Sequence, residues 1–558
     1  MTMISPWKQK LSYMIPMRDG VRLSCDIRFP KGEGRFPVVL FRTPYNKARD
    51  LLDPEVTRWT DQGYVFVAQD CRGRHESEGH FEPMIQDAAD GVDTIKWIRE
   101  QPFCNGQVCM TGASYCGWTQ LAAASSNPAG LEAILPQVMT TEKMDSRTSF
   151  GGIKGMLNVW WLLLNTNRSQ MADPVGDWDS FLAQLPVNRL DETLGFHPIP
   201  AFRKALDPQM SADMWENHSI LEGLDSCDVP ICLGVGWFDV FAGGAMRDAS
   251  RLIALRTRQG QDNFRVIAGP WGHGLCEKTE CGELDFGSDS LIDLMGLQNA
   301  FVAHQLKGTP LPEELGKSVL YFLMGTNVWK QADNWPPSEC VEKTFFLDSE
   351  GKANSHLGDG QLSAESPNCS GSDHYICNPL DPVPSIGGAS LFLHAPAGPM
   401  DQRPAEERDD VLCYTSEELD KAVTIVGIPR AEIFVETSAV DTDFFVRICD
   451  VYPDGRSMLV TDGGMRMAHR EGMASPVPVI PGECYKLEID LTSTAMCFLP
   501  GHRLRIEITS SCFPRFIRNL NSAKDPTEEI ESDAVIARQI VHHSTDRLSR
   551  LILPILDS

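Results

Sequence analysis

The first 140 residues alternate short apolar segments with a helical stretch, and this alternation constrains the fold more than any other sequence feature. Residues 87–100 carry apolar side chains largely along one face of a predicted helix. Strands are predicted on either side of it, at 37–41, 64–68, 107–110 and 133–138. Strands that are joined through helices need crossover connections, so we expect a mainly parallel sheet.

Two changes of pattern divide the rest of the chain. From residue 141 to about 224 the strand signals stop, and apolar residues recur at helical spacing. Strand signals return at 229–235 and 265–268, and a last helix is predicted at 291–306. The sequence therefore predicts one α/β domain in two parts, with a helical insertion between them. The predicted ranges are 1–140 and 225–313 for the α/β domain and 141–224 for the insertion.

Beyond residue 313 short apolar runs are separated by Gly, Pro, Asp and Asn turns. The clearest runs are 319–324, 431–438, 443–449 and 503–509. Only 532–540 carries a helical pattern here. Many short strands with regular turns are typical of an all-β sandwich, which we predict over residues 314–558.

The charge balance excludes several classes of partner. The chain has 50 Lys and Arg against 76 Asp and Glu, a formal net charge of −26. Such a protein repels phosphate backbones and anionic membranes. Its longest apolar run, 159–164, is far short of the roughly 20 residues of a membrane span, and the first residues lack the apolar core of a signal peptide. We expect a cytoplasmic protein that binds neither nucleic acid nor membrane.

The 17 cysteines are scattered and form no C-x-x-C pair, so neither a disulfide framework nor a zinc ribbon is expected. His273, Cys276 and Cys281 are the one arrangement that offers three metal ligands. No fourth ligand follows at a recognisable spacing, so no metal is predicted. Most cysteines are expected to be small buried side chains in a reducing compartment.

The strongest local signal is a Gly-x-Ser turn between an apolar strand and a helix of small residues, with Ser114 at its centre. A serine on such a turn projects its hydroxyl above the sheet. The helix N-terminus and the Tyr115 amide then face the charge that develops there. The usual motif has glycine two positions after the serine, where this chain has Cys116. A turn serine without a chemical role is the alternative.

A serine nucleophile needs a histidine base and an orienting carboxylate. Asp239 follows the strand predicted at 229–235, and His273 follows the one at 265–268. In α/β-hydrolases the three residues come in the order Ser, acid, His, each on a loop after a strand. Asp239 and His273 agree with Ser114 in both respects, although a turn aspartate and a surface histidine are the ordinary interpretations.

The loops GASYCG around Ser114, GWFDVF around Asp239 and GPWGHG around His273 resemble those of the cocaine-esterase/X-Pro dipeptidyl-peptidase family of serine hydrolases. The family pattern G-x-S-Y-x-G accommodates Cys116. Further segments resemble the family in the same order, at 42–47, 69–79, 441–456 and 513–519. The resemblance implies an α/β-hydrolase core with an inserted helical cap, followed by a C-terminal all-β jelly-roll domain.

The resemblance also implies how the reaction proceeds. Tyr45 matches the family tyrosine whose hydroxyl forms the oxyanion hole together with the amide of the residue after the serine, here Tyr115. The sequence has no H-G-G motif to supply a donor instead. The chain is then expected to cleave an ester, or an amide, through an acyl-enzyme, with no metal or organic cofactor.

The substrate is predicted from the positions after the acid. Relatives that hydrolyse α-amino-acid esters carry acids two and three residues after it, where this chain has Phe241 and Ala242. Phe241 instead matches an aromatic residue of the acyl pocket in the cocaine-esterase branch. Further aromatic candidates, with core packing as their alternative role, are Trp118, Phe150, Trp160 and Trp161.

We therefore expect the partner to be a small-molecule substrate with an apolar or aromatic acyl group. An acyltransferase or cyclising enzyme with the same triad, and a non-catalytic ligand-binding protein, are the alternatives. A homodimer is compatible with the sequence.

Overall fold

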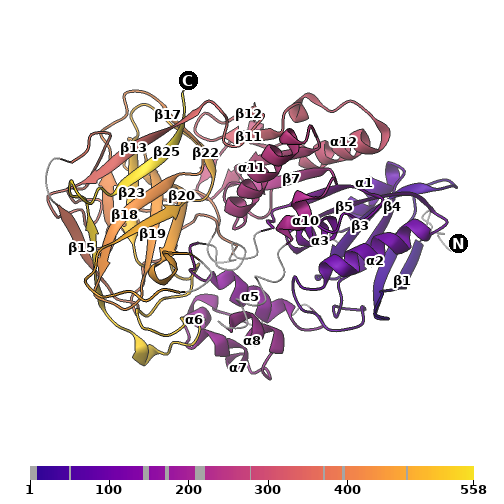
Figure 1. The fold of residues 1–558 in the computed structure, drawn as a ribbon, viewed down its shortest axis with the longest axis horizontal. Helices are drawn as coiled ribbons and strands as arrows, with labels where there is room; N and C mark the ends of the chain where they lie inside the picture. Colours follow the sequence, from indigo (N-terminus) through magenta and orange to yellow (C-terminus); the bar gives the residue numbers. More distant parts are fainter. Residues whose placement is uncertain are drawn as a thin grey trace.

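The computed structural model describes residues 9–49, 52–141, 150–169, 175–207, 220–276, 278–367, 371–391, 396–472 and 476–557. The described residues form two large sheets, one of 10 strands and one of 13. The two sheets occupy opposite ends of the molecule, and a group of short helices lies beside both (Figure 1). No helix within the described ranges is long and apolar enough to cross a bilayer.

The first sheet has the strand order β1-β2-β4-β3-β5-β6-β7-β8-β11-β12. Its central strands, from β4 to β11, pair in parallel, whereas β1, β2 and β12 pair antiparallel at the two edges. The strands are β1 Gln9–Pro16, β2 Arg22–Arg28, β3 Phe36–Thr43, β4 Val65–Asp70, β5 Cys104–Ala113, β6 Leu131–Gln137, β7 Ile231–Gly236, β8 Phe264–Gly269, β11 Val319–Leu323 and β12 Val328–Ala332. Because neighbouring central strands run in parallel, the loops at their carboxyl ends meet along one edge, where ligands bind in such sheets.

Helices cover both faces of this sheet. They are α1 Asp53–Asp61, α2 Asp87–Glu100, α3 Tyr115–Ala124, α11 Ala242–Arg258 and α12 Leu294–Lys307. Side chains of α2, α3 and α11 share one core, whereas α1 and α12 pack into a second core on the other face. The helix α12 shows how the sequence sets such an element: the Asp293 side chain accepts from Gly296 N at 2.8 Å at its start, and Gly308 ends it with φ of 67°.

Between β6 and β7 the chain forms the helical cap. Its elements are α5 Met156–Asn165, α6 Trp178–Leu182, η2 Val187–Arg189, α7 Leu190–Thr193, α8 Pro200–Leu206 and α10 Leu221–Asp225. The cap has a small apolar core of its own, to which Ile517 of the C-terminal part contributes. The C-terminal part also holds the start of α5, because Met156 N donates to Arg515 O and Ile517 N donates to Lys154 O, both at 2.9 Å.

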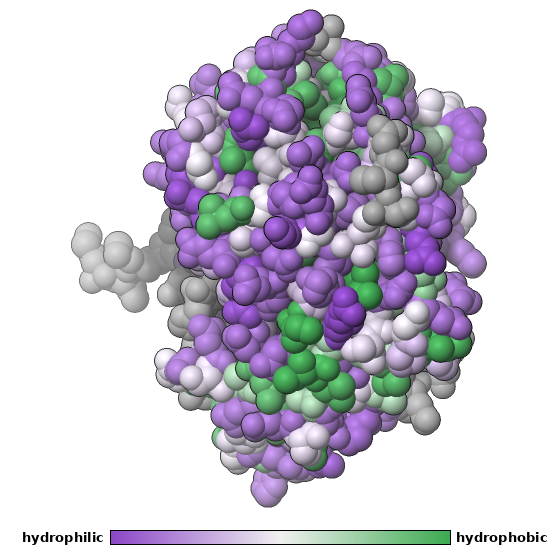
Figure 2. Space-filling model, turned by 90° about the vertical axis from the view of Figure 1, so that its left-hand side faces the viewer, coloured by the Kyte–Doolittle hydropathy of each residue, from purple (hydrophilic) through white to green (hydrophobic). Residues whose placement is uncertain are grey.

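The second sheet is almost entirely antiparallel and forms the C-terminal β-rich domain. Its strands are β13 Cys340–Asp348, β14 Gln361–Ser363, β15 Ser372–Cys377, β16 Leu412–Thr415, β17 Val423–Gly427, β18 Arg430–Thr437, β19 Asp443–Val451, β20 Ser457–Arg466, β21 Tyr485–Asp490, β22 Thr494–Phe498, β23 Arg503–Thr509, β24 Ala537–His542 and β25 Arg550–Leu556. The face of the molecule that Figure 2 presents, on this side, is mostly hydrophilic with a few apolar clusters.

The remaining elements are short. They are β9 Glu280–Cys281, β10 Leu284–Asp285, η3 Ser288–Ser290, η4 Glu313–Leu315, α13 Arg403–Glu406, η5 Met467–His469 and η6 Glu531–Asp533. The strands β9 and β10 pair only with each other, in a hairpin that follows the loop after β8.

Two expectations about single segments are wrong. The run 319–324 was assigned to the sandwich, but β11 extends the first sheet, with Val319 paired in parallel to Val266 of β8. All residues of β11 are buried, and a short apolar run of this kind looks the same in sequence whether it belongs to a parallel sheet or to a sandwich. The segment 532–540 was expected to be helical, yet β24 pairs with β15 and β18. Its side chains alternate in burial with the period of a strand.

Candidate active site

Ser114 lies at the turn between β5 and α3, where its backbone adopts φ of 58° and ψ of −130°. A non-glycine residue in this region is strained, and such strain persists where the surrounding structure holds it. Here Ser114 N donates to Gln137 O at 2.9 Å, and Gly117 N donates to Ser114 O at 2.7 Å. The turn also needs Gly112, because a Cβ there would lie 2.6 Å from the Cβ of Cys116. The local fold therefore fixes Ser114 at the carboxyl edge of the sheet.

Asp239 and His273 occupy the loops after the neighbouring strands β7 and β8. The His273 Nδ1 atom lies 2.5 Å from Asp239 Oδ2, and the backbone N of Phe241 donates to Asp239 Oδ1 at 2.9 Å. The Asp239 side chain is 1% exposed and that of His273 is 15% exposed. A buried carboxylate thus orients an imidazole that can still be reached from solvent, and this leaves Nε2 as its free nitrogen.

Tyr45 follows β3, and the Ser114 side chain is one of the groups that act on the pKa of its hydroxyl. The hydroxyl accepts a hydrogen bond from Trp161 Nε1 at 2.9 Å. Burial raises the pKa of Tyr45 above its ordinary value, against the opposing effect of Trp161 and Ser114. The phenol is therefore neutral at physiological pH and keeps a proton that it can donate.

The amide of Tyr115 begins α3 beside Ser114, and its side chain enters a buried polar network. Its hydroxyl donates to Asp87 Oδ2 and accepts from Met84 N, both at 2.7 Å. The guanidinium of Arg42 donates to the Asp87 carbonyl oxygen at 2.8 Å. Asp87 and Arg42 were not predicted as neighbours of the site. Asp87 is a carboxylate at the first position of a predicted helix, where acids are common, and Arg42 begins the segment 42–47 that resembles the family.

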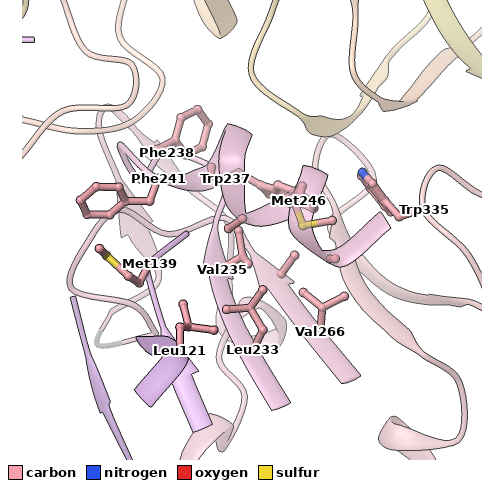
Figure 3. Close-up of a cluster of buried hydrophobic side chains, with 14 of the residues drawn as sticks. Leu121, Met139, Leu233, Val235, Trp237, Phe238, Phe241, Met246, Val266 and Trp335 are labelled. Carbon is pink, nitrogen blue, oxygen red and sulfur yellow. The ribbon is translucent and has the colours of Figure 1, made fainter. Parts of the chain in front are cut away.

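Phe241 is the substrate-pocket candidate that lies next to the histidine. Its ring centroid is 5.8 Å from that of His273. In Figure 3 its side chain lies at the left of the cluster, with Phe238 above it and Met139 below it. Phe150, another candidate, lines the same pocket as Phe241 where the core, the start of α5 and the sandwich meet.

The three tryptophan candidates have different surroundings. Trp118 is 1% exposed on α3 and belongs to the main core of the α/β domain. Trp160 packs edge-on against Trp178 inside the cap, with ring centroids 6.3 Å apart. The indole of Trp161 is parallel to the ring of Tyr115, which follows Ser114, with centroids 5.5 Å apart and planes 7° apart. Adjacent positions on one helix thus face different parts of the molecule.

Two groups of three metal-ligand side chains occur among the described residues, both in the sandwich and outside the candidate site. They are Glu436, Cys484 and His542, and Glu406, Cys449 and Glu507. Glu436 already accepts from His542 and from Arg547, at 2.7 and 3.3 Å. Glu406 in turn accepts from Arg505 at 2.5 Å. These carboxylates are thus paired with cations of the protein itself.

Known proteins resemble this chain over most of its length. Residues 19–275 match the X-Pro dipeptidyl-peptidase (S15 family) model, and residues 314–552 match the X-Pro dipeptidyl-peptidase C-terminal non-catalytic domain. The cocaine esterase of Rhodococcus sp. (strain MB1 Bresler) is 34% identical over 97% of this chain and 98% of its own. The chain belongs to the cocaine-esterase/X-Pro dipeptidyl-peptidase family. It is an α/β-hydrolase that acts as a carboxylic-ester serine hydrolase, as the resemblance implied.

Two solved structures resemble this chain over almost its whole length. An aminopeptidase from a marine sediment Thaumarchaeota archaeon superposes with a TM-score of 0.86 and 26% identity, covering 100% of this chain and 98% of its own. An α-amino acid ester hydrolase gives a TM-score of 0.85 at 24% identity, covering 99% and 97%. The second likeness concerns the fold alone. The cocaine-esterase family member thus has the α/β core and the C-terminal β-rich domain of these proteins.

Proposed function

We propose that Ser114, His273 and Asp239 form the catalytic triad of an esterase for small molecules with an apolar or aromatic acyl group. The observation that carries the proposal is the 2.5 Å contact between His273 and Asp239, on loops at the same sheet edge as Ser114. A histidine whose Nδ1 is held by a buried carboxylate has its Nε2 free to accept a serine proton.

The reaction proceeds in two halves. His273 takes the proton of the Ser114 hydroxyl as Oγ attacks the acyl carbonyl carbon, and the oxyanion accepts from the Tyr45 hydroxyl and the Tyr115 amide. The protonated imidazole then gives its proton to the leaving alcohol oxygen. In the second half His273 deprotonates water, which attacks the acyl carbonyl carbon. The protonated imidazole then returns its proton to Ser114 Oγ as the acyl–Oγ bond breaks and the acid is released. Asp239 stabilises the charged imidazole throughout.

The acyl preference rests on Phe241. Its side chain is 8% exposed and packs beside His273, so it offers the acyl group apolar contact and no charge partner. Aromatic contacts of this kind contribute about 0.5–1.5 kcal/mol beyond burial. A substrate ammonium needs a carboxylate, and neither Phe241 nor the adjacent Ala242 supplies one.

The test is a panel of benzoyl, alkanoyl and α-aminoacyl esters, assayed with and without alcohol or amine acceptors and followed by mass spectrometry of the products. The Phe241→Asp variant should lower kcat/KM for benzoyl and alkanoyl esters and raise it for α-aminoacyl esters. A wild type that already prefers the ammonium-bearing ester would contradict the pocket assignment. Transfer of the acyl group to the acceptor instead of water would identify an acyltransferase.

The setting that we propose is cytoplasmic. All 16 cysteines in the described ranges are free thiols, and most are buried. Unpaired cysteines in this number are typical of a reducing compartment.

A further inference from the structure

The hydroxyl of Tyr45 is held from the cap as well as from the core. Trp161, on α5 of the cap, donates its Nε1 proton to this oxygen at 2.9 Å, while Tyr45 itself follows β3 of the core. A phenol has one proton and two acceptor sites, whereas an indole N–H can only donate. The indole therefore occupies one lone pair, and the phenolic proton is left to point away from Trp161.

The indole itself has little freedom to move. Its face lies against Tyr115, with ring centroids 5.5 Å apart, and its edge meets Tyr45 at 6.4 Å and 86°. Phe81 adds a third ring with its centroid at 6.4 Å. Because Tyr115 is also fixed through Asp87, the direction of the Trp161 N–H bond is set by residues of the α/β core. Such a rigid donor defines the rotor position of the hydroxyl that it contacts.

We propose that Trp161 is a positioning residue for the oxyanion hole. Its N–H orients and polarises the Tyr45 hydroxyl, so that the phenolic proton faces the oxyanion on the substrate. Hydrogen bonds in such a chain strengthen one another, and the effect grows as charge develops at the far end. No proton changes owner along this chain. The inference rests on the proposed role of Tyr45, and it gives the cap a part in the chemistry besides covering the site.

The sandwich takes part in this arrangement through α5. The first turn of α5 is hydrogen-bonded to Arg515 through Met156 N, and Lys154 Nζ pairs with Asp525 at 2.7 Å. Trp161 lies on the same helix, little more than one turn from Met156. The position of its N–H therefore depends on contacts with all three parts of the chain.

The test removes the N–H and keeps the ring. Trp161→Phe should lower kcat for a small aryl ester about five- to tenfold, the effect of one hydrogen bond, with KM changed less than twofold. Trp160→Phe is the matched control, because its ring contacts Trp178 inside the cap and should leave both parameters within twofold. A Trp161→Phe effect that is confined to KM, or no effect at all, would overturn the proposal.

A double-mutant cycle separates positioning from packing. Tyr45→Phe alone should lower kcat about 10²- to 10³-fold, as the loss of an oxyanion donor does. In the Tyr45→Phe background Trp161→Phe should then have no further effect, because the hydroxyl that it orients is gone. If the two losses multiply, Trp161 acts by packing alone and the proposal is wrong.

Two measurements guard the interpretation. If Tyr45→Phe is still labelled at Ser114 by a fluorophosphonate and keeps the wild-type kcat, Tyr45 is not part of the oxyanion hole. If Tyr45→Phe lowers kcat strongly but the effect of Trp161→Phe is independent of it, only the role of Trp161 is overturned. If Trp161→Phe does not fold, benzothienylalanine at position 161 replaces it, because sulfur substitutes for the ring N–H at almost the same shape. That variant should show the same five- to tenfold fall in kcat, and wild-type kcat in it would overturn the proposal.

Discussion

A buried tyrosine donates a hydrogen bond to a buried aspartate both in the α/β core and in the sandwich, but the pKa values of the two aspartates shift in opposite directions. In the α/β core the Tyr115 hydroxyl donates to Asp87 at 2.7 Å, and in the sandwich the Tyr414 hydroxyl donates to Asp373 at 2.8 Å. Burial raises the pKa of Asp87, although the charge of Arg42 and the Tyr115 hydrogen bond oppose the rise. Burial acts in the same direction on Asp373, yet its pKa is lowered.

The number of donors explains the difference. Besides Tyr414, three groups hydrogen-bond to the Asp373 carboxylate, and together they outweigh its burial. They are His543 Nε2 at 3.1 Å, Ser349 Oγ at 2.7 Å and Ala353 N at 2.9 Å. Asp87 relies on Tyr115 and on a guanidinium nitrogen of Arg42 3.9 Å away. The sandwich thus encloses a fully paired ion, whereas the core keeps a poorly compensated carboxylate next to the candidate site, where perturbed groups tend to occur.

The largest expected effect tests whether the reaction takes place in the α/β core, at Ser114. Ser114→Ala should lower kcat by up to about 10⁶-fold, because only the oxyanion hole and substrate binding would remain. It should also abolish labelling by a fluorophosphonate probe while leaving circular dichroism unchanged. Stoichiometric labelling of Ser114→Ala would show that another serine is the nucleophile.

The next effect should distinguish the two tyrosines. Tyr115→Phe takes a donor from Asp87 and loosens the ring on which Trp161 stacks, so turnover should fall about tenfold by misplacement of the site. The free energy of unfolding should fall by about 1–3 kcal/mol, because a buried acceptor loses its partner. Steady-state kinetics and denaturant unfolding of one preparation give both numbers. Turnover equal to wild type would remove the link between Asp87 and the site.

Tyr414→Phe is the counterpart in the sandwich. It should lower the free energy of unfolding by a similar 1–3 kcal/mol. Turnover per active site, counted by fluorophosphonate titration, should stay at the wild-type value, because Asp373 retains three other donors and belongs to the sandwich. A fall in turnover here would mean that the sandwich influences the reaction through this carboxylate.

The smallest effect concerns pH. Asp87 has a raised folded-state pKa, so its contribution to stability is complete below its ordinary value of 3.8 and is lost as pH rises through the folded value. The lowered pKa of Asp373 gives a contribution that is present above 3.8 and is lost only as pH falls through the folded value. As the pH rises above 3.8, the destabilisation by Tyr115→Phe should therefore grow, whereas that by Tyr414→Phe stays level. Urea unfolding at several pH values measures this destabilisation for both variants. If it changes with pH equally in the two variants, the difference between Asp87 and Asp373 is contradicted.

Local patterns predicted much of the α/β core. The helix expected at 87–100 is α2, and each central strand from β3 to β8 contains or overlaps the expected run. Strand ends also placed Ser114, Asp239 and His273 at one edge, because parallel strands bring their carboxyl ends together. The strands β1 and β2 were not predicted. Most residues of the edge strand β1 are exposed and give a weak apolar signal, whereas β2 is largely buried but carries the polar residues Ser24 and Asp26 within its run.

Contacts between distant segments could not be predicted from one sequence. The bond from Trp161 to Tyr45 joins residues 116 positions apart, and nothing in the helical pattern of 156–165 tells Trp161 from Trp160. The same holds for Asp87, whose partner Tyr115 lies on another helix. The substrate role of Phe150 stays a prediction, and its place beside Phe241 depends on how the sandwich packs against the cap.

The backbone of Ser114 has a consequence for attempts to engineer this protein. Its φ of 58° and ψ of −130° suit glycine, and holding a side chain there costs about 1–3 kcal/mol. A library selected for heat resistance alone would therefore favour glycine at the position of the proposed nucleophile. Directed evolution toward a sturdier enzyme from this chain has to screen for turnover in every round.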